Sequence, residues 1–92
     1  MLKPVYERKF EREVELAKKR GWDIEKLKNV MKDLINEKPL AAKHVNHKLK
    51  GNFVGYWECH ITPDWLLIYK KDQTRIYFVR TGTQISSKTL TL

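Results

Sequence analysis

The chain has 92 residues, of which 41% are hydrophobic and 33% are charged, and its formal net charge is +8 at pH 7. This length predicts one domain spanning residues 1–92, and the apolar content excludes an intrinsically disordered chain. The surplus of Lys and Arg favours anionic partners: phosphate backbones, acidic protein segments or anionic lipid. A basic domain without any such partner has the same composition, so charge alone does not name the partner.

Compartment and membrane topology follow from what the sequence lacks. A single cysteine, Cys59, excludes an intramolecular disulfide and fits a reducing compartment. The start, MLKPVYERKFER, has no apolar segment of the kind found in signal peptides. No run approaches the roughly 20 apolar residues of a membrane span. We therefore expect a cytoplasmic protein that does not enter the membrane.

The chain opens with a short strand and a helix. Residues 2–6 read as a strand, which Pro4 confines to the edge of a sheet because proline has no N–H to donate. Phe10, Val14 and Ala17 follow at i, i+4 and i+7, which is the spacing of one helical face. Three consecutive cations then fill the last turn, where they suit the negative end of the helix dipole.

A second helix follows after a short connection. Gly21 is a natural residue just past the end of the first helix, and Asp23 is a plausible N-cap for the second. Pro39 is expected to end the second helix. So short a connection predicts an antiparallel helical hairpin. The apolar stripe of the second helix is the strongest periodic signal in the chain: Leu27, Val30, Met31, Leu34 and Ile35.

After Pro39 the periodicity changes from helix to strand. Residues 40–52 read as a basic loop, and alternation along residues 53–61 (FVGYWECHI) predicts a strand. The continuous apolar run WLLIYKK, residues 65–71, is typical of a strand buried on both faces. The segment RIYFVRT, residues 75–81, predicts another strand, and TPD and KDQT supply the turns between the three.

Helices that precede a run of strands favour the α+β class. We expect the helical hairpin to pack on one face of a small antiparallel sheet, in the order strand, helix, helix, strand, strand, strand. The other face is then left for function. On the first of the three consecutive strands, alternation puts Tyr56, Glu58 and His60 on one face and Trp57, Cys59 and Ile61 on the other.

Imidazole and carboxylate side chains gather beside these strands. Cleavage of RNA without a metal needs a base for the ribose 2′-OH, an acid for the 5′-oxygen leaving group and a cation for the charged phosphorane. Histidine titrates near neutral pH and can take either proton-transfer role. His47, His60 and Asp64 are therefore candidates for the base and the acid, although each histidine alone fits a surface residue as well.

Other side chains suit RNA binding. Arg80 can stabilise phosphate charge together with nearby lysines, of which Lys48 and Lys50 closely follow the histidine at position 47. Trp65 can stack on a base. These residue types alone do not identify the protein as a nuclease.

Two other kinds of chemistry are less well supported. His44, His47 and His60 with Cys59 or Asp64 supply enough ligands for zinc. However, Cys59 and His60 are adjacent on a predicted strand and so point to opposite faces, and no standard zinc spacing is present. Cys59 shares a face with apolar neighbours, which indicates a small core residue and not a nucleophile. We expect no metal and no cofactor.

A series of short motifs runs through the second half of the chain. H-x-L-x-G spans residues 47–51, PDWLLIY spans 63–69 and RTGT spans 80–83, with Gly55 and His60 between them. In this order and spacing the chain resembles the YafQ group of the RelE/ParE superfamily of bacterial type II toxins. The resemblance extends over essentially the whole length, since the basic helical hairpin and the segment LINEKPL fit as well.

This resemblance implies a function and a set of partners. Such toxins are ribosome-dependent endoribonucleases that cut mRNA in the ribosomal A site, and a cognate antitoxin with an acidic, partly disordered tail neutralises them. The resemblance assigns catalytic roles to His47, His60 and Asp64. It also assigns the motif tryptophan to Trp65 and a phosphate contact to Arg80.

One departure from the family pattern affects the expected activity. The family usually places a histidine after RTGT, but this chain has Gln84, and Lys88 stands where a phenylalanine is usual. Glutamine can hydrogen-bond a phosphate or a leaving oxygen, but it cannot donate a proton near neutral pH. We expect reduced activity, an inactivated enzyme, or one that recruits another acid such as His60. The alternatives are a non-catalytic module that binds RNA or the antitoxin, and gyrase inhibition as in the ParE branch, which lacks the histidine cluster.

Overall fold

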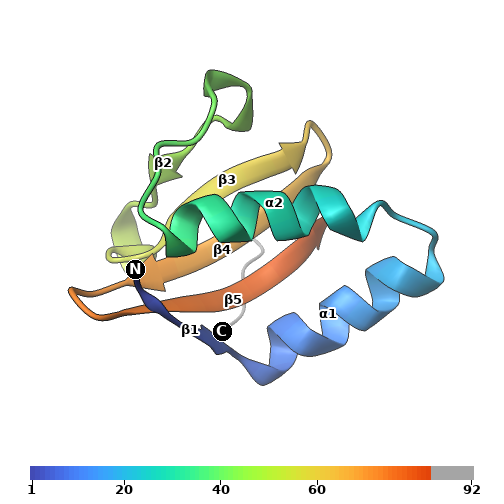
Figure 1. Ribbon diagram of the computed structural model, residues 1–92, viewed down its shortest axis with the longest axis horizontal. Helices are drawn as coiled ribbons and strands as arrows, with labels where there is room; N and C mark the ends of the chain where they lie inside the picture. The colour runs from blue at the N-terminus through green and yellow to red at the C-terminus, as the bar shows by residue number, and fades with distance from the viewer. Residues whose placement is uncertain (84–92) are drawn as a thin grey trace.

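Two helices pack across one face of a five-stranded sheet in this computed structural model, which describes residues 1–83 (Figure 1). The predicted α+β class, with a helical hairpin on one face of the sheet, is confirmed. The elements are β1 (Lys3–Tyr6), α1 (Arg8–Lys19), α2 (Ile24–Ile35), β2 (His47–Lys48), β3 (Trp57–Thr62), β4 (Trp65–Lys71) and β5 (Arg75–Thr83), with 3₁₀ turns η1 (Ala42–His44) and η2 (Gly51–Phe53).

The strands lie in the order β1-β5-β4-β3-β2. Neighbours from β5 to β2 pair antiparallel, but β1 runs parallel to β5. The expectation of a wholly antiparallel sheet is therefore wrong for β1. Parallel neighbours need a long crossover, and here the crossover is the whole chain between the first and last strands. Pro4 lies on this edge strand, as predicted.

The connection between the helices has the predicted capping. Gly21 adopts a φ of +78°, and its N–H and that of Trp22 donate to carbonyls in the last turn of α1. This pattern satisfies carbonyls that would otherwise be left unpaired at the helix end. The Asp23 carboxylate accepts a hydrogen bond from the Glu25 N–H at 3.1 Å and so caps α2.

The second helix ends earlier than predicted. It stops at Ile35, with Asn36 as the C-cap, and does not run up to Pro39. Glu37 then adopts a φ of +58°, which belongs to the left-handed region and cannot continue a right-handed helix. Proline therefore follows the helix end and is not its immediate cause.

The main core lies between the helices and the sheet. The predicted helical stripes supply Phe10 and Ala17 from α1 and Leu27, Val30 and Leu34 from α2, all buried. The sheet contributes alternate residues of its strands, which face the helices as the period of two requires. These residues include Cys59, Ile61, Trp65, Leu67, Tyr69, Ile76 and Phe78.

A smaller apolar cluster covers part of the opposite side of the sheet, called here the helix-free face. Residues 40–52, predicted as a loop, contain the short strand β2, which pairs with the start of β3. A two-residue strand has no readable periodicity, so the sequence could not reveal it. Leu49 closes over β4 and β5 in a cluster completed by Leu66, Ile68 and Val79, with Phe53, Tyr56 and Tyr77 packed around them. The helix-free face is therefore partly filled.

The predicted strands otherwise agree with the structure. The first five residues of β4 are buried, as expected for a strand covered on both faces, and β5 extends two residues further than predicted, to Thr83. At the hairpin between them, the Asp72 carboxylate accepts hydrogen bonds from the N–H groups of Thr74 and Arg75, each at 2.8 Å. Within residues 1–83, no helix combines the length and the apolar character needed to cross a membrane.

Candidate active site

The pairing of β2 with β3 places a histidine beside a carboxylate. His47 lies opposite Glu58, and residues directly opposite on antiparallel strands share a face. His47 Nδ1–H donates to the Val45 carbonyl at 2.9 Å, and its Nε2 lies 3.5 Å from Glu58 Oε1. Both ring nitrogens therefore face acceptors, and only the doubly protonated imidazole donates to both. The Glu58 side chain is 11% exposed and that of His47 is 46% exposed, so the pair lies at the surface.

The second histidine is held at the end of β3. His60 Nδ1–H donates to the Pro63 carbonyl at 3.3 Å. Because a carbonyl only accepts, the proton of the neutral ring lies on Nδ1 and the lone pair on Nε2. The backbone is fixed as well, since the His44 ring donates to the His60 carbonyl at 2.6 Å. His44, predicted as a loop residue outside the motif, thus supports the strand that carries His60.

The two histidines lie on the same face of neighbouring strands. His60 is two residues beyond Glu58 along β3, so it is the diagonal neighbour of His47. Diagonal neighbours across such a pair are separated by roughly 7–8 Å. The structure thus brings together His47 and His60. Glu58, which we expected either to orient His60 or to be solvated, contacts His47 instead.

Asp64 belongs to a different part of the surface. It is exposed on the turn between β3 and β4 and lines a cavity of about 370 Å³ on the helix side of the sheet. Its neighbours there include Trp22 and Lys26. Asp64 and His60 are linked only through the turn, where His60 contacts the adjacent Pro63 carbonyl. The expected clustering of Asp64 with both histidines is therefore only partial.

Arg80 is held by a partner that the sequence did not indicate. Its Nε and Nη2 donate to the two carboxylate oxygens of Glu13 on α1, at 2.8 and 2.9 Å. These hydrogen bonds hold the pKa of Arg80 above its ordinary value, so the guanidinium keeps its charge. Glu13 also accepts the Thr81 N–H at 3.2 Å. Any contact between Arg80 and phosphate must use the part of the guanidinium that Glu13 does not occupy.

Trp65 is a core residue. Its side chain is 4% exposed and packs against Trp22, with ring centroids 5.0 Å apart. Its Nε1–H donates to Thr81 Oγ1 at 2.8 Å, and that hydroxyl donates to the Leu66 carbonyl. The predicted role of Trp65 in base stacking is therefore wrong, because the indole is buried under the helical hairpin. The apolar run around it correctly indicated burial.

The two lysines beside His47 do not share its surroundings. Lys48 lies opposite Trp57, which packs against the helix-side core, and its ammonium lies 5.3 Å from the centroid of that ring. Alternation thus turns Lys48 to the face opposite His47. Lys50 is exposed at the start of η2. Gln84, the remaining predicted site residue, lies outside the described residues.

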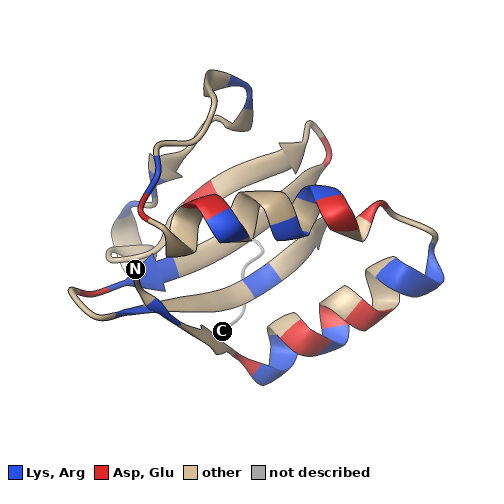
Figure 2. Ribbon diagram, in the orientation of Figure 1, with Lys and Arg blue, Asp and Glu red and all other residues tan. Residues whose placement is uncertain are grey.

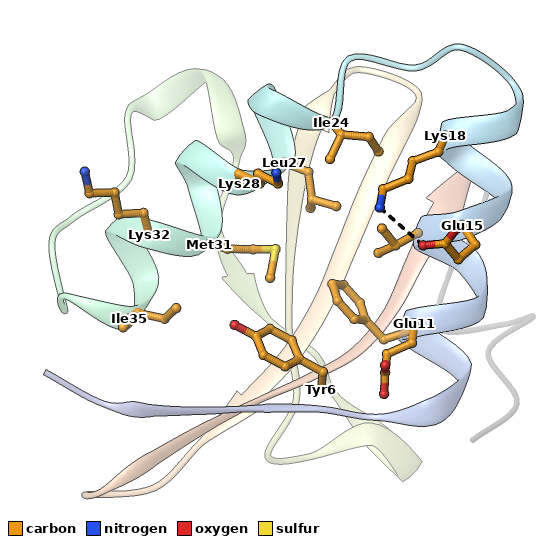
Figure 3. Close-up of a pocket in the computed structure, with 12 residues that line it drawn as sticks. Tyr6, Glu11, Glu15, Lys18, Ile24, Leu27, Lys28, Met31, Lys32 and Ile35 are labelled. Atoms are coloured by element: carbon orange, nitrogen blue, oxygen red, sulfur yellow. Dashed lines mark hydrogen bonds and ion pairs between the residues drawn. The ribbon is translucent and has the colours of Figure 1, made fainter.

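Positive charge does not by itself select this site. Lys and Arg are spread over both helices, the segment after α2 and the end of β4 (Figure 2). A groove of about 450 Å³ lies between α1, α2 and Tyr6 of β1 (Figure 3). It contains no histidine, and Lys18 on its rim pairs with Glu15 at 3.2 Å. Among residues 1–83, no three His, Cys, Asp or Glu side chains are arranged to hold a metal ion.

Cys59 is buried, and burial, followed by the nearby Glu58 charge, raises the pKa of its thiol from an ordinary 9.0 to about 12. Burial also raises the pKa of Tyr69.

The buried thiol of Cys59 predicts a pH dependence of stability. The unfolded thiol ionises near pH 9 while the native thiol stays protonated, so the native state binds more protons above pH 9. We therefore expect the free energy of unfolding to fall as the pH rises from about 9 to about 12. Urea unfolding at pH 8 and pH 10 measures the fall, and Cys59→Ala should reduce it; an equal fall in the variant would contradict the assignment.

Comparison with known proteins identifies the class of protein to which this chain belongs. A family of toxins from bacterial type II toxin–antitoxin systems matches residues 2–86. The chain belongs to this family, described as "Bacterial toxin of type II toxin-antitoxin system, YafQ".

Individual relatives agree with this assignment. The mRNA interferase toxin YafQ of Escherichia coli (strain K12) is 44% identical over 79 residues, which cover 85% of this chain and 86% of that protein. The crystal structure of YafQ from E. coli strain BL21(DE3) superposes with a TM-score of 0.86 at 42% identity, covering 91% of this chain and 94% of that one. A YafQ chain from the E. coli DinJ–YafQ toxin–antitoxin complex gives a TM-score of 0.84 at 42% identity, covering 89% and 91%.

Proposed function

We propose that this toxin is an endoribonuclease that cleaves mRNA on the ribosome in the cytoplasm and is neutralised by a cognate antitoxin. The observation that supports the proposal is the position of His47 and His60, which are diagonal neighbours on one face of the sheet. The E. coli relatives named mRNA interferase support the same activity. No cofactor is required, because two imidazoles suffice for both proton transfers.

The hydrogen bonds of the two rings suggest how the roles divide. His60 Nε2 carries a lone pair and accepts the proton of the ribose 2′-OH, whose oxygen attacks the phosphorus. The bond from phosphorus to the 5′-oxygen then breaks, and His47 Nε2–H supplies the proton that the leaving oxygen takes up, in place of the histidine that the family usually has at position 84. Glu58 positions the His47 ring for this step. The products are a 2′,3′-cyclic phosphate and a 5′-hydroxyl.

Arg80 and Asp64 assist this centre. The Arg80 guanidinium, oriented by Glu13, contributes a positive charge that stabilises the charged phosphorane. Asp64 lies on the helix side of the turn that follows His60, so its proposed role is a hydrogen bond to the ribose or base of the strand where it passes this turn.

The antitoxin is the second partner of the proposal. The formal charge of +8 favours an acidic chain wrapped around the toxin. The relative from E. coli is known in a complex with the antitoxin DinJ. We propose a counterpart of that antitoxin, with an acidic segment, as the partner of this chain.

Purified protein added to translating ribosomes tests the function. We expect new mRNA 5′ ends at codons that occupy the A site, and growth arrest when the toxin is expressed without its antitoxin. Cleavage of the same mRNA without ribosomes would contradict ribosome dependence. The absence of both cuts and growth arrest would instead favour a non-catalytic module that binds RNA or antitoxin, an alternative supported by the amide at Gln84.

Restoring a histidine at position 84 is expected to increase cleavage. Removing a general acid typically lowers a rate by about 10²–10⁴-fold, and Gln84→His supplies an imidazole where the family usually has one. Single-turnover cleavage by the two proteins, compared at pH 6 to 8, measures the gain. Gln84→Asn is the matched control, because it changes the side chain without adding a proton donor. An unchanged rate in Gln84→His would reject a proton-donor role for this position.

A further inference from the structure

A lysine and two tyrosines form a row on the helix-free face. The Lys70 ammonium lies 5.3 Å from the centroid of the Tyr56 ring and 5.2 Å from that of the Tyr77 ring. Lys70 and Tyr77 are paired across β4 and β5, and Tyr56 directly precedes β3. All three side chains are half-buried, so the rings are fixed by packing and still reach the surface. These three residues are called here the lysine–tyrosine row.

The row shares its face with the histidine pair. Along β4, Lys70 is two residues from Ile68, which lies opposite Glu58 in the register of β3 and β4. Side chains two residues apart on a strand share a face and are separated by about 7 Å. The row therefore lies one step along the sheet from Glu58 and His47, on the same side.

The chemistry of the row suits single-stranded RNA. Tyrosine rings are platforms on which bases stack, and an ammonium beside them can bind the connecting phosphate. Among residues 1–83, none forms an ion pair with Lys70, so its charge is balanced only by the two ring faces. A phosphate can approach without displacing a carboxylate, in contrast to the situation at Arg80.

We propose that the lysine–tyrosine row binds the mRNA strand next to the cleaved linkage, with Lys70 on a phosphate and a tyrosine ring under a base. This inference rests on the proposed function, since it supplies the substrate contacts that the buried Trp65 does not. The row fixes the register of the strand on the sheet and so helps to select the linkage presented to His47 and His60.

The adjacent lysine provides a matched control. Lys71 is the next residue on β4, carries the same charge and also lies over an aromatic ring, at 5.7 Å from the centroid of Trp57. Alternation places it on the opposite face of the sheet. Lys70→Gln and Lys71→Gln therefore remove the same charge from the same strand, on opposite faces of the sheet.

The experiment measures binding and cleavage for these variants. Binding of a single-stranded RNA oligonucleotide to the full chain is measured over a series of salt concentrations, and KM is measured on ribosome-bound mRNA. We expect Lys70→Gln to weaken binding of the oligonucleotide about tenfold and to raise KM about tenfold. The slope of log affinity against log salt concentration should fall by about 0.7, the value for one phosphate contact on a single strand. Tyr77→Leu should weaken binding without changing the slope.

The other outcomes are distinguishable. Equal effects of Lys70→Gln and Lys71→Gln would show that only net charge matters and would overturn the proposal. A Lys70→Gln defect on ribosomes with unchanged oligonucleotide binding would assign the row to ribosomal RNA, which also overturns it. If the unaltered protein neither binds nor cleaves RNA, the proposed function itself fails.

Discussion

Replacing His60 with alanine is expected to lower the rate of mRNA cleavage about 10²–10⁴-fold and to leave antitoxin binding intact. The reason is that the His60 ring carries the unprotonated nitrogen of the pair and bonds only to the Pro63 carbonyl among the described contacts. Its removal takes away a proton acceptor and little packing. Single-turnover cleavage on ribosomes measures the first effect, and titration with the antitoxin measures the second.

Two variants of His44 test whether the hydrogen bond to the His60 carbonyl is needed for cleavage. His44→Ala removes the ring that supports the His60 carbonyl, whereas His44→Asn keeps an N–H at nearly the same place. We expect cleavage to fall in the first variant and to be retained in the second. Full activity of His60→Ala would place the general base elsewhere. Loss of antitoxin binding in His60→Ala would indicate that this residue belongs to the protein interface.

Replacing Trp65 with alanine is expected to lower the free energy of unfolding by about 3–5 kcal/mol. The substitution leaves a large cavity beside Trp22, and it removes the hydrogen bond to the buried Thr81 hydroxyl. Urea unfolding at neutral pH measures the loss. A small domain has a total stability of about 5–15 kcal/mol, so this loss is a large fraction of the total.

Two further variants make this result specific. Trp57→Ala removes an indole that is only half-buried and should cost clearly less. Trp65→Phe keeps most of the packing and loses the N–H donor. Its loss of stability should therefore lie between those of Trp57→Ala and Trp65→Ala. If Trp65→Ala were as stable as the unaltered protein yet failed to bind RNA, the indole would be at the surface in solution. That outcome would restore the base-stacking role that the sequence suggested for Trp65.

Local patterns were sufficient to predict most of the fold. The helical stripes, the cap at Asp23 and the glycine at position 21 all depend on neighbours within a few residues, and the structure confirms them. The apolar run of β4 likewise predicted a strand buried on both faces. The parallel pairing of β1 with β5 was not predictable, because the residues of β1 do not indicate which strand will pair with them.

The pairings within the candidate site could not be predicted from the sequence. A resemblance across the whole chain indicated His47 and His60, and the register of β2 and β3 makes them diagonal neighbours on one face of the sheet. Their supporting contacts depend on β2, which is too short to leave a pattern, so the roles of Glu58 and His44 were missed.

The pairing of Arg80 with Glu13 joins residues 67 positions apart. No local signal could have indicated it. Long-range contacts of this kind are fixed by the packing of α1 against β5, and they appear only once the fold is known.

The bond between Glu13 and the Thr81 N–H has a consequence for assembly. Within residues 1–83, β1 pairs with residues Arg75 to Phe78, and no described strand pairs with the remainder of β5 on that side. Such an exposed edge invites an extended segment of another chain to dock by backbone pairing. Here the side chain from α1 already occupies an amide that a newcomer would need. The Glu13 side chain of α1 thus satisfies a backbone N–H of β5 that would otherwise need a partner from another strand.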